Sequence, residues 1–437
     1  MNKSIRIYLL YTILSVFIAP SAESQVLQLF EVNLYNPISL NDIDSISFNI
    51  QSDMMVIHQT DGAINNFNYF YDSNYPIGPS IPIIEINTNE YQEEITSKTI
   101  YSEGNLTLRS FDKYEDIERT LSIRGRGNSS WGFIKKPYRL KFDKKISLCG
   151  LPSAKNYVLL ANYMDCSLIQ NVLAFKIGEL LGLPFTNKAV PVDVILNGIY
   201  KGSYLLTNKP GINAGSVDID EENSIMWELD VNFDEELKFK SPIFDLPVMV
   251  ADPDMSEETF EYWKNDFIEM ERAVYNRTGG DYIDMELAAK YLAVYEILKN
   301  DEIGFPKSFK MFKTKGSKYI FGPIWDFDTA MGKIWLGECY SQDKIDASVW
   351  KNKLLSYLSL DPVFKEAYFL HLKFIIDKVP ELITFIDNYA IDIRESAIRN
   401  QNIYPDYEDF EESVVKLKDW LLKRSLALKV IHNLQPE

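Results

Sequence analysis

Residues 124–142 read RGRGNSSWGFIKKPYRLKF, and this stretch decides how the rest of the chain is interpreted. It opens with two arginines that alternate with two glycines, followed by an asparagine and a serine: Arg124, Gly125, Arg126, Gly127, Asn128 and Ser129. Glycine allows backbone conformations that other residues avoid and lets main-chain N–H groups approach a ligand closely. Two guanidinium groups beside exposed N–H groups favour a bound phosphate or carboxylate. A tight basic hairpin would look the same, so the downstream sequence has to decide between the two interpretations.

The second half of the stretch has the alternation of a β-strand. Tyr138, Leu140 and Phe142 are apolar, while Arg139 and Lys141 between them are charged. Because side chains alternate between the two faces of a strand, Lys141 is predicted on the face opposite the apolar residues.

The sequence on both sides predicts strands first and helices later. Before residue 252, strands or strand-like runs are predicted over 81–88, 99–111, 119–127, 137–145, 157–165, 190–208 and 224–231. Asn197-Gly198 is a hairpin signal, and one helix interrupts the strands over 167–183, with Gly182 as its stop. After residue 252 the pattern is helical over 258–277 and 285–300, then two short strands follow over 308–313 and 318–326, and the chain is helical up to Leu434. This order predicts an α+β fold with two lobes.

The N-terminal residues predict two further segments. Residues 1–24 have a basic start, an apolar run over 7–19 and small residues near Ser24, which is typical of a secretory signal cleaved near Ser24. The apolar run is shorter than the roughly 18 residues that a membrane helix needs, and no later run is long enough. Residues 25–79 carry short strand patterns and end in a proline-containing linker, so we expect a small β module there and one large domain over 80–437. The mature chain would be exported to the periplasm, the cell surface or the medium.

Composition excludes several classes of protein. The 437 residues carry a formal net charge of -18, which argues against a nucleic-acid binder. Only three cysteines and three histidines are present and they are scattered, which argues against a disulfide scaffold, a zinc site or a Ser-His-Asp enzyme. Any chemistry therefore has to use carboxylates, lysine, arginine and the backbone.

A second candidate site lies in WDFD at 325–328. If these residues end a strand, period two places Asp326 and Asp328 on one side, where they could hold a divalent cation against phosphates. Upstream, Asn300, Asp301 and Glu302 close a helix and open a loop, and could supply a metal ligand and a base for a substrate hydroxyl. The alternative is a strand end with capping carboxylates.

Several separated blocks, in order, resemble the CotH family of spore-coat-type atypical protein kinases. They are RGRGNSSWGFIKKPYRLKF, LPSAKNYVLLANYMD, GELLGLP, LNGIYKGSYLLT, ELD and FGPIWDFDTAMG, and they cover roughly 81 to at least 332. The N-terminal module looks like those that precede such domains in secreted Bacteroidetes-type proteins.

The resemblance implies a bilobal kinase-like fold that binds ATP with Mg²⁺ or Mn²⁺ between the lobes. It implies that 124–129 cover the phosphates, that Lys141 is the strand lysine on the α/β-phosphates, and that Glu228 lies near the base edge. It also implies that Asp326 holds the metal, that Asp328 assists, and that the loop with Asn300 carries the catalytic base.

This chain departs from the family pattern in that loop. Many relatives read Asn-x-Asp, whereas here Asn300 is followed by Asp301 and then Glu302. The base is therefore Glu302, Asp301 or neither. The expected function is transfer of the ATP γ-phosphoryl group to a hydroxyl of an unidentified protein or glycan. The alternative is a catalytically inactive kinase fold that serves as an envelope or extracellular binding module.

Overall fold

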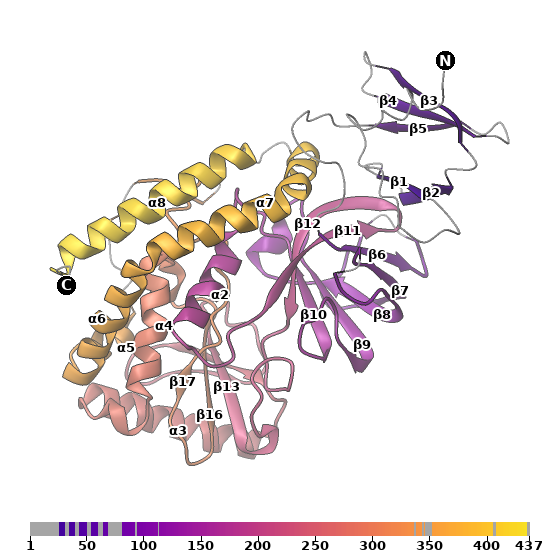
Figure 1. Cartoon of the computed structure of the whole chain (residues 1–437). Coiled ribbons are helices and arrows are strands. Elements are labelled where there is room, and N and C mark those ends of the chain that lie inside the picture. Colours follow the sequence, from indigo (N-terminus) through magenta and orange to yellow (C-terminus); the bar gives the residue numbers. More distant parts are fainter. Residues whose placement is uncertain are drawn as a thin grey trace.

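Figure 1 shows the chain as a computed structural model. The structure describes five N-terminal strands by their backbone and then residues 81–434, with gaps at 92–93, 112, 336–337, 343–344, 346–351 and 405–407. The predicted signal segment, residues 1–24, lies outside the described residues.

The N-terminal strands form two small antiparallel sheets. β1 (Val26–Phe30) pairs with β2 (Tyr35–Ser39), and β4 (Met54–Gln59) pairs with both β3 (Ile43–Asn49) and β5 (Ile64–Asn68). The strand patterns predicted over 25–79 are thus present, while the division of the chain at residue 79 stays a prediction.

The next seven strands close into a barrel. They are β6 (Ile83–Thr88), β7 (Ser102–Arg109), β8 (Ile117–Gly125), β9 (Tyr138–Ile146), β10 (Ala154–Leu160), β11 (Ala189–Leu196) and β12 (Ile199–Asn208). Their order is β10-β12-β11-β6-β7-β8-β9, and the pair of β11 with β6 is parallel. Asn197 and Gly198, both with positive φ, make the tight turn between β11 and β12 that the sequence predicts. Alternation along each strand fills the interior with apolar side chains such as Leu140, Leu159 and Leu206.

The C-terminal part combines a sheet with helices. The sheet has the order β14-β15-β13-β16-β17, from β13 (Ser224–Leu229), β14 (Lys238–Lys240), β15 (Pro247–Asp252), β16 (Phe309–Thr314) and β17 (Ile320–Phe321). The helices are α2 (Gln170–Leu180), α3 (Glu257–Tyr275), α4 (Met285–Ile297), α5 (Lys353–Leu358), α6 (Pro362–Asp377), α7 (Val379–Ile403) and α8 (Phe410–Ile431). The predicted α+β composition, rich in strands first and helices later, is confirmed.

Local signals explain where the helices begin and end. Asp284, Asp361 and Asp409 each accept a hydrogen bond from the first turn of α4, α6 and α8. The predicted stop of α2 is also present: Gly182 has a φ of 65° and its N–H donates to Glu179 O at 2.9 Å.

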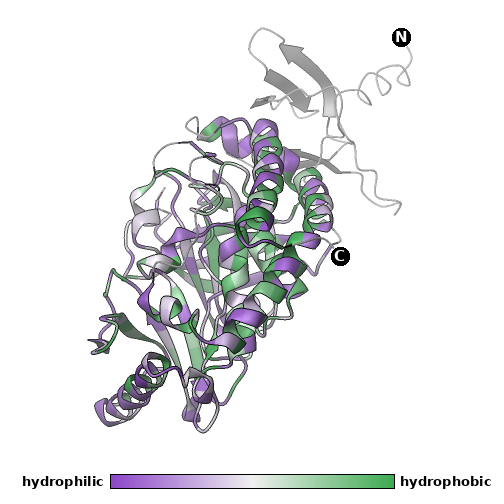
Figure 2. Cartoon of the chain, turned by 90° about the vertical axis from the view of Figure 1, so that its left-hand side faces the viewer, coloured by the Kyte–Doolittle hydropathy of each residue, from purple (hydrophilic) through white to green (hydrophobic). Residues whose placement is uncertain are grey.

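A second core joins the outer face of the barrel to the C-terminal part. Val158, Leu160 and Leu205 point out of the barrel and belong to one buried apolar cluster with α2, α4 and the C-terminal helices. In Figure 2 the helices near the C-terminus carry hydrophobic and hydrophilic residues side by side, as helices with one buried face do. The cluster holds α4, and hence the loop that follows it, against the barrel.

Two ion pairs, each with a buried carboxylate, fix the positions of α7 and α8. Arg399 on α7 binds Asp193 on β11 at 2.6 Å, and α7 runs along β12 (Figure 1). Arg424 on α8 binds the Glu296 carboxylate at 2.8 Å and donates to the Glu296 carbonyl group at the end of α4. Removing one partner of such a pair leaves a buried charge, so these contacts specify the arrangement of the helices.

The strand predicted over 318–326 is wrong in its length. β17 ends at Phe321, and residues 322–328 have no strand structure. Pro323 lacks an N–H group and cannot continue the ladder. The period-two argument for Asp326 and Asp328 therefore fails.

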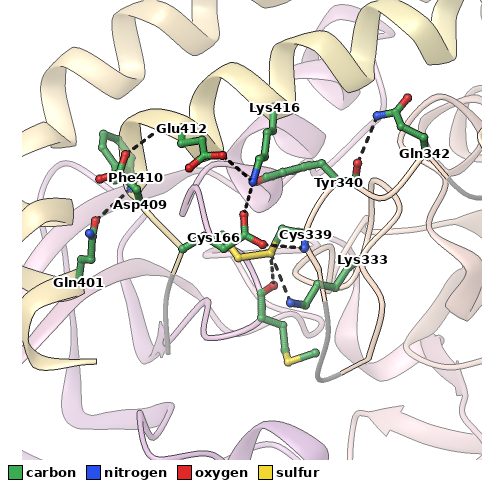
Figure 3. Close-up of polar contacts among 12 residues, drawn as sticks. Cys166, Lys333, Cys339, Tyr340, Gln342, Gln401, Asp409, Phe410, Glu412 and Lys416 are labelled. Atoms are coloured by element: carbon green, nitrogen blue, oxygen red, sulfur yellow. Dashed lines mark hydrogen bonds and ion pairs between the residues drawn. A yellow bond between two sulfur atoms is a disulfide. The ribbon is translucent and has the colours of Figure 1, made fainter. Parts of the chain in front are cut away.

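A disulfide that the sequence analysis did not predict joins Cys166, before α2, to Cys339, which is 173 residues further on. Figure 3 shows it with the Lys333 ammonium 3.3 Å from the Cys339 sulfur. Cys149 is the remaining cysteine, free and buried. Among the residues that the structure describes, no helix is both long and apolar enough to cross a bilayer.

Candidate active site

The glycine-rich turn after β8 is shaped by packing. A Cβ atom on Gly125 would lie 2.2 Å from the ring of Trp131, so only glycine leaves room for this indole. Gly127 has a φ of 83°, in the left-handed region that glycine favours. The Lys98 ammonium donates to the Gly127 carbonyl oxygen at 2.9 Å, and Asn128 donates to the Asp234 carboxylate at 3.2 Å. The turn is thus a packed structure that contacts the C-terminal part.

Asp326 lies in a tight turn that three hydrogen bonds hold, two to its backbone and one to its side chain. Its φ is 66°, in the left-handed region, and its carbonyl oxygen accepts from Asn300 Nδ2 at 2.9 Å. The next N–H group, of Phe327, donates to Asn171 Oδ1 at 2.9 Å. Ser308 Oγ donates to the Asp326 carboxylate at 3.1 Å. These contacts fix the direction of the Asp326 side chain.

Three carboxylates converge at this turn. The side chains of Asp326, Asp328 and Glu302 interact electrostatically with one another. Burial, with Asp326 and Glu302 beside it, raises the pKa of Asp328 well above its usual range. Burial, followed by the charge of Asp326, raises the pKa of Glu302 to about 7. Like charges crowded together favour a divalent cation, and carboxylate oxygens are the ligands that Mg²⁺ and Mn²⁺ prefer.

The loop after α4 separates the two candidate bases. Asn300 caps the short helix Asp301–Gly304, because its Oδ1 accepts from Glu302 N at 3.1 Å. Asp301 pairs with Lys299 at 2.5 Å. Glu302 pairs with Lys307 at 2.5 Å, and among the two acids it is the one that raises the pKa of Asp328. The structure therefore brings Glu302 to the carboxylate cluster.

The raised pKa of Glu302 predicts a pH dependence of stability. In the unfolded chain the carboxyl group titrates near its ordinary value, so the metal-free folded state loses stability as pH rises from about 4.5 to about 7. The loss from this group is about 3 kcal/mol. Chemical denaturation across this window should give a weaker pH dependence for Glu302→Gln than for the unsubstituted protein. Asp301→Asn removes the neighbouring acid and is the control; equal slopes in all three proteins would contradict the prediction.

Arg126 connects the glycine-rich turn to the carboxylates. Its guanidinium carbon lies 5.6 Å from the centre of the Trp325 ring. Burial lowers the pKa of Arg126, while Asp326, Glu228 and Asp328 act in the opposite direction. The predicted basic turn and the predicted acidic turn therefore face each other, although they are about 200 residues apart in sequence.

The other predicted nucleotide-binding residues have local contacts outside the carboxylate cluster. Lys141 is on the outer face of β9, as predicted, but it is exposed and its ammonium is 5.7 Å from the centre of the Tyr101 ring. Glu228 on β13 pairs with Lys310 on β16 at 2.5 Å. Ser129 begins the short helix Ser129–Gly132.

Sequence analysis assigned no site role to three residues that hold the cluster, which are Asn171, Lys307 and Ser308. It also assigned none to Lys310, which pairs with Glu228. The sequence did contain a signal for Lys310, because the alternation in 308–313 places this lysine on the same strand face as Ser308. Asn171 gave no such signal, because its partner is 156 residues away.

Comparison with protein families identifies the chain. The model of the CotH kinase protein family matches residues 123–428, which is more than half of the sequence. The chain belongs to the CotH kinase family. No curated protein matches it. The family match includes the glycine-rich turn, the loop with Asn300 and the turn with Asp326, so the resemblance drawn from the sequence blocks is confirmed.

Proposed function

We propose that this protein is an exported kinase with a bilobal, kinase-like fold that transfers the γ-phosphoryl group of ATP to a hydroxyl group of a protein or glycan. The observation that carries the proposal is the convergence of Asp326, Asp328 and Glu302 in a family of kinases. Such transfer depends on positioning and charge neutralisation, and needs no nucleophilic side chain.

Different residues of the chain would bind the metal, cover the nucleotide and take the proton. Asp326 and Asp328 would hold Mg²⁺ or Mn²⁺, which would neutralise charge on the phosphates. The turn at 124–129 would cover the nucleotide, with Arg126 close to the metal-binding carboxylates, while Lys141 and Glu228 stay predictions for the phosphates and the base edge. Asn300 would position the loop through its contacts with Glu302 N and the Asp326 carbonyl group. Glu302 would orient the acceptor hydroxyl and take its proton.

The disulfide supports the exported location. Bonds such as Cys166–Cys339 persist in oxidising compartments and are rare in the cytosol. The signal segment and the final compartment remain predictions.

A transfer assay tests the proposal and the identity of the base. Residues 25–437 would be incubated with γ-labelled ATP, Mg²⁺ or Mn²⁺, and a generic protein acceptor. Because general-base catalysis contributes roughly a hundredfold or more, Glu302→Gln should lower incorporation by about that factor with nucleotide binding retained. Asp301→Asn should stay within a few-fold of the unsubstituted protein.

Two results would change this assignment. A large loss in Asp301→Asn with none in Glu302→Gln would place the base at Asp301. Absence of both label incorporation and metal-dependent ATP binding would favour the alternative, an inactive kinase fold that binds envelope or extracellular partners.

A further inference from the structure

Two arginines face each other on the outer surface of the barrel. In the antiparallel pair β8·β9, Arg124 lies directly opposite Arg139. Cross-strand neighbours of like charge destabilise a sheet, since their side chains begin only about 5 Å apart. This pair therefore needs a compensating interaction.

The described residues supply little compensation for the two guanidinium groups. The Nε atoms of Arg124 and Arg139 are both buried without a hydrogen-bond partner. Arg139 donates through Nη2 to Asn156 Oδ1 at 3.0 Å, and Arg124 donates to the Gly125 carbonyl oxygen at 3.4 Å. Both acceptors are neutral. The Arg124 guanidinium carbon also lies 5.2 Å from the centre of the Tyr101 ring, a contact that carries no negative charge. A buried donor without a partner costs free energy, so an anion at this point would satisfy both side chains.

A third cation, Lys209, lies next to this pair of arginines, and the three side chains form a cationic row. The backbone N–H of Lys209, just after β12, donates to the Asn156 carbonyl oxygen at 3.3 Å, which places Lys209 next to the residue that Arg139 binds. Within the described part of the chain, the Lys209 ammonium has no hydrogen bond or ion pair. Burial, followed by the positive charge of Arg139, lowers its pKa, and Lys310 acts in the same direction. Lys209 is thus a partly buried cation beside other cations.

Two acids lie nearby and do not cancel this charge. Asp252 and Glu235 interact electrostatically with both Arg139 and Lys209, but form no ion pair with either. The Asp252 carboxylate accepts from the Ile212 N–H group. Burial and the neighbouring Glu228 raise the pKa of Glu235.

The cationic row adjoins the carboxylate cluster through Arg126, which interacts with Arg139 on one side and with Asp326 and Asp328 on the other. We propose that Arg139 and Lys209, together with Arg124, form the binding site for the polyphosphate chain of the nucleotide. Its far end would then reach the metal-binding carboxylates. The inference rests on the proposed function for the identity of the ligand, while the anion site stands on the contacts above.

This assignment differs from the expected role of Lys141. Arg139 and Lys141 share the outer face of β9, but Arg139 is half-buried and contacts Asn156, whereas Lys141 is exposed beside Tyr101. A partly desolvated cation interacts with phosphate more strongly than an exposed one. Arg139 and Lys209 therefore contribute more to phosphate binding than Lys141 does.

Calorimetric titration with inorganic tripolyphosphate, ATP and AMP tests the site in the whole mature chain. Arg139→Gln and Lys209→Gln should each weaken binding of tripolyphosphate, and of ATP with Mg²⁺, by about tenfold or more. AMP binding should change less, because AMP lacks the β- and γ-phosphates. Arg139→Lys should restore part of the affinity. Lys144→Gln, which changes an exposed lysine on the same strand, is the matched control and should bind as the unsubstituted protein does.

The possible results separate this inference from the proposed function. Unchanged affinity in Arg139→Gln and Lys209→Gln, with a large loss in Lys141→Gln, would overturn the inference and leave the kinase proposal standing. Binding of tripolyphosphate that depends on Arg139 and Lys209, without any binding of ATP, would support the anion site. It would also show that the ligand of this site is not the nucleotide. Failure of the unsubstituted protein to bind either ligand would overturn both.

Discussion

Asp326→Asn is expected to abolish metal-dependent ATP binding and to lower phosphoryl transfer by about a thousandfold or more. Loss of one preorganised electrostatic contact to a transition state costs about a hundred- to a thousandfold, and here a metal ligand is lost as well. Asparagine is preferable to alanine at this position. It tolerates the φ of 66° and can still accept the hydrogen bond from Ser308, so that the charge alone is removed.

The measurement is the rise in melting temperature on addition of ATP with Mg²⁺, together with label transfer. The unsubstituted protein should show a rise and Asp326→Asn none. In Asp326→Asn, Asp328 and Glu302 no longer have the negative charge of Asp326 beside them. Without metal, this variant should therefore melt no lower than the unsubstituted protein. Asp245→Asn is the matched control, an exposed aspartate that also has positive φ, at 56°. A full ligand-induced rise in Asp326→Asn would exclude Asp326 as the metal ligand.

The sequence was sufficient to predict those parts of the molecule that depend on local signals. Alternation predicted the strands of the barrel, Asn197-Gly198 predicted the hairpin between β11 and β12, and Gly182 predicted the end of α2. The two candidate turns were also found, because glycines, arginines and paired aspartates are unusual at such spacing.

What escaped prediction depends on contacts between distant segments. Asp326 and Asp328 meet because the chain turns in the left-handed region after Pro323, and not because they share a strand face. Arg139 was counted only as an alternating charge, since neither its opposition to Arg124 nor the approach of Lys209 can be read from spacing. A side chain's role in this site is decided by what lies across from it.

The same limit applies to the three cysteines, whose number argued against a disulfide scaffold. One pair nevertheless forms, because Cys166 precedes α2 and the 338–342 segment returns to that point. Asp165, next to Cys166, accepts hydrogen bonds from Gln170 N at 2.8 Å and from the Tyr340 hydroxyl at 3.1 Å. The disulfide thus lies in a tightly hydrogen-bonded region that joins the start of α2 to the segment after Asp328.

Removal of the disulfide is expected to cause a large loss of stability. A cross-link that closes a loop of 173 residues restricts the unfolded chain, and chain-entropy arguments assign it about 5 kcal/mol. The double substitution Cys166→Ser with Cys339→Ser should therefore lower the melting temperature by roughly 5 °C in a chain of this size. Thermal unfolding of the two proteins, each with and without dithiothreitol, measures this.

The reductant provides the control for the substitution itself. It should destabilise the unsubstituted protein and leave the double variant unchanged, because the remaining Cys149 is buried and unpaired. The ATP- and Mg²⁺-induced rise in melting temperature should persist in the variant, because the contacts of Asp326 with Ser308 and Asn300 do not involve the disulfide. Equal melting temperatures of the parent in both conditions would show that the bond adds nothing to the stability of the protein. Loss of the ligand-induced rise together with the disulfide would instead assign the bond a role in positioning the metal-binding turn, transmitted through Asn171 and the backbone of Phe327.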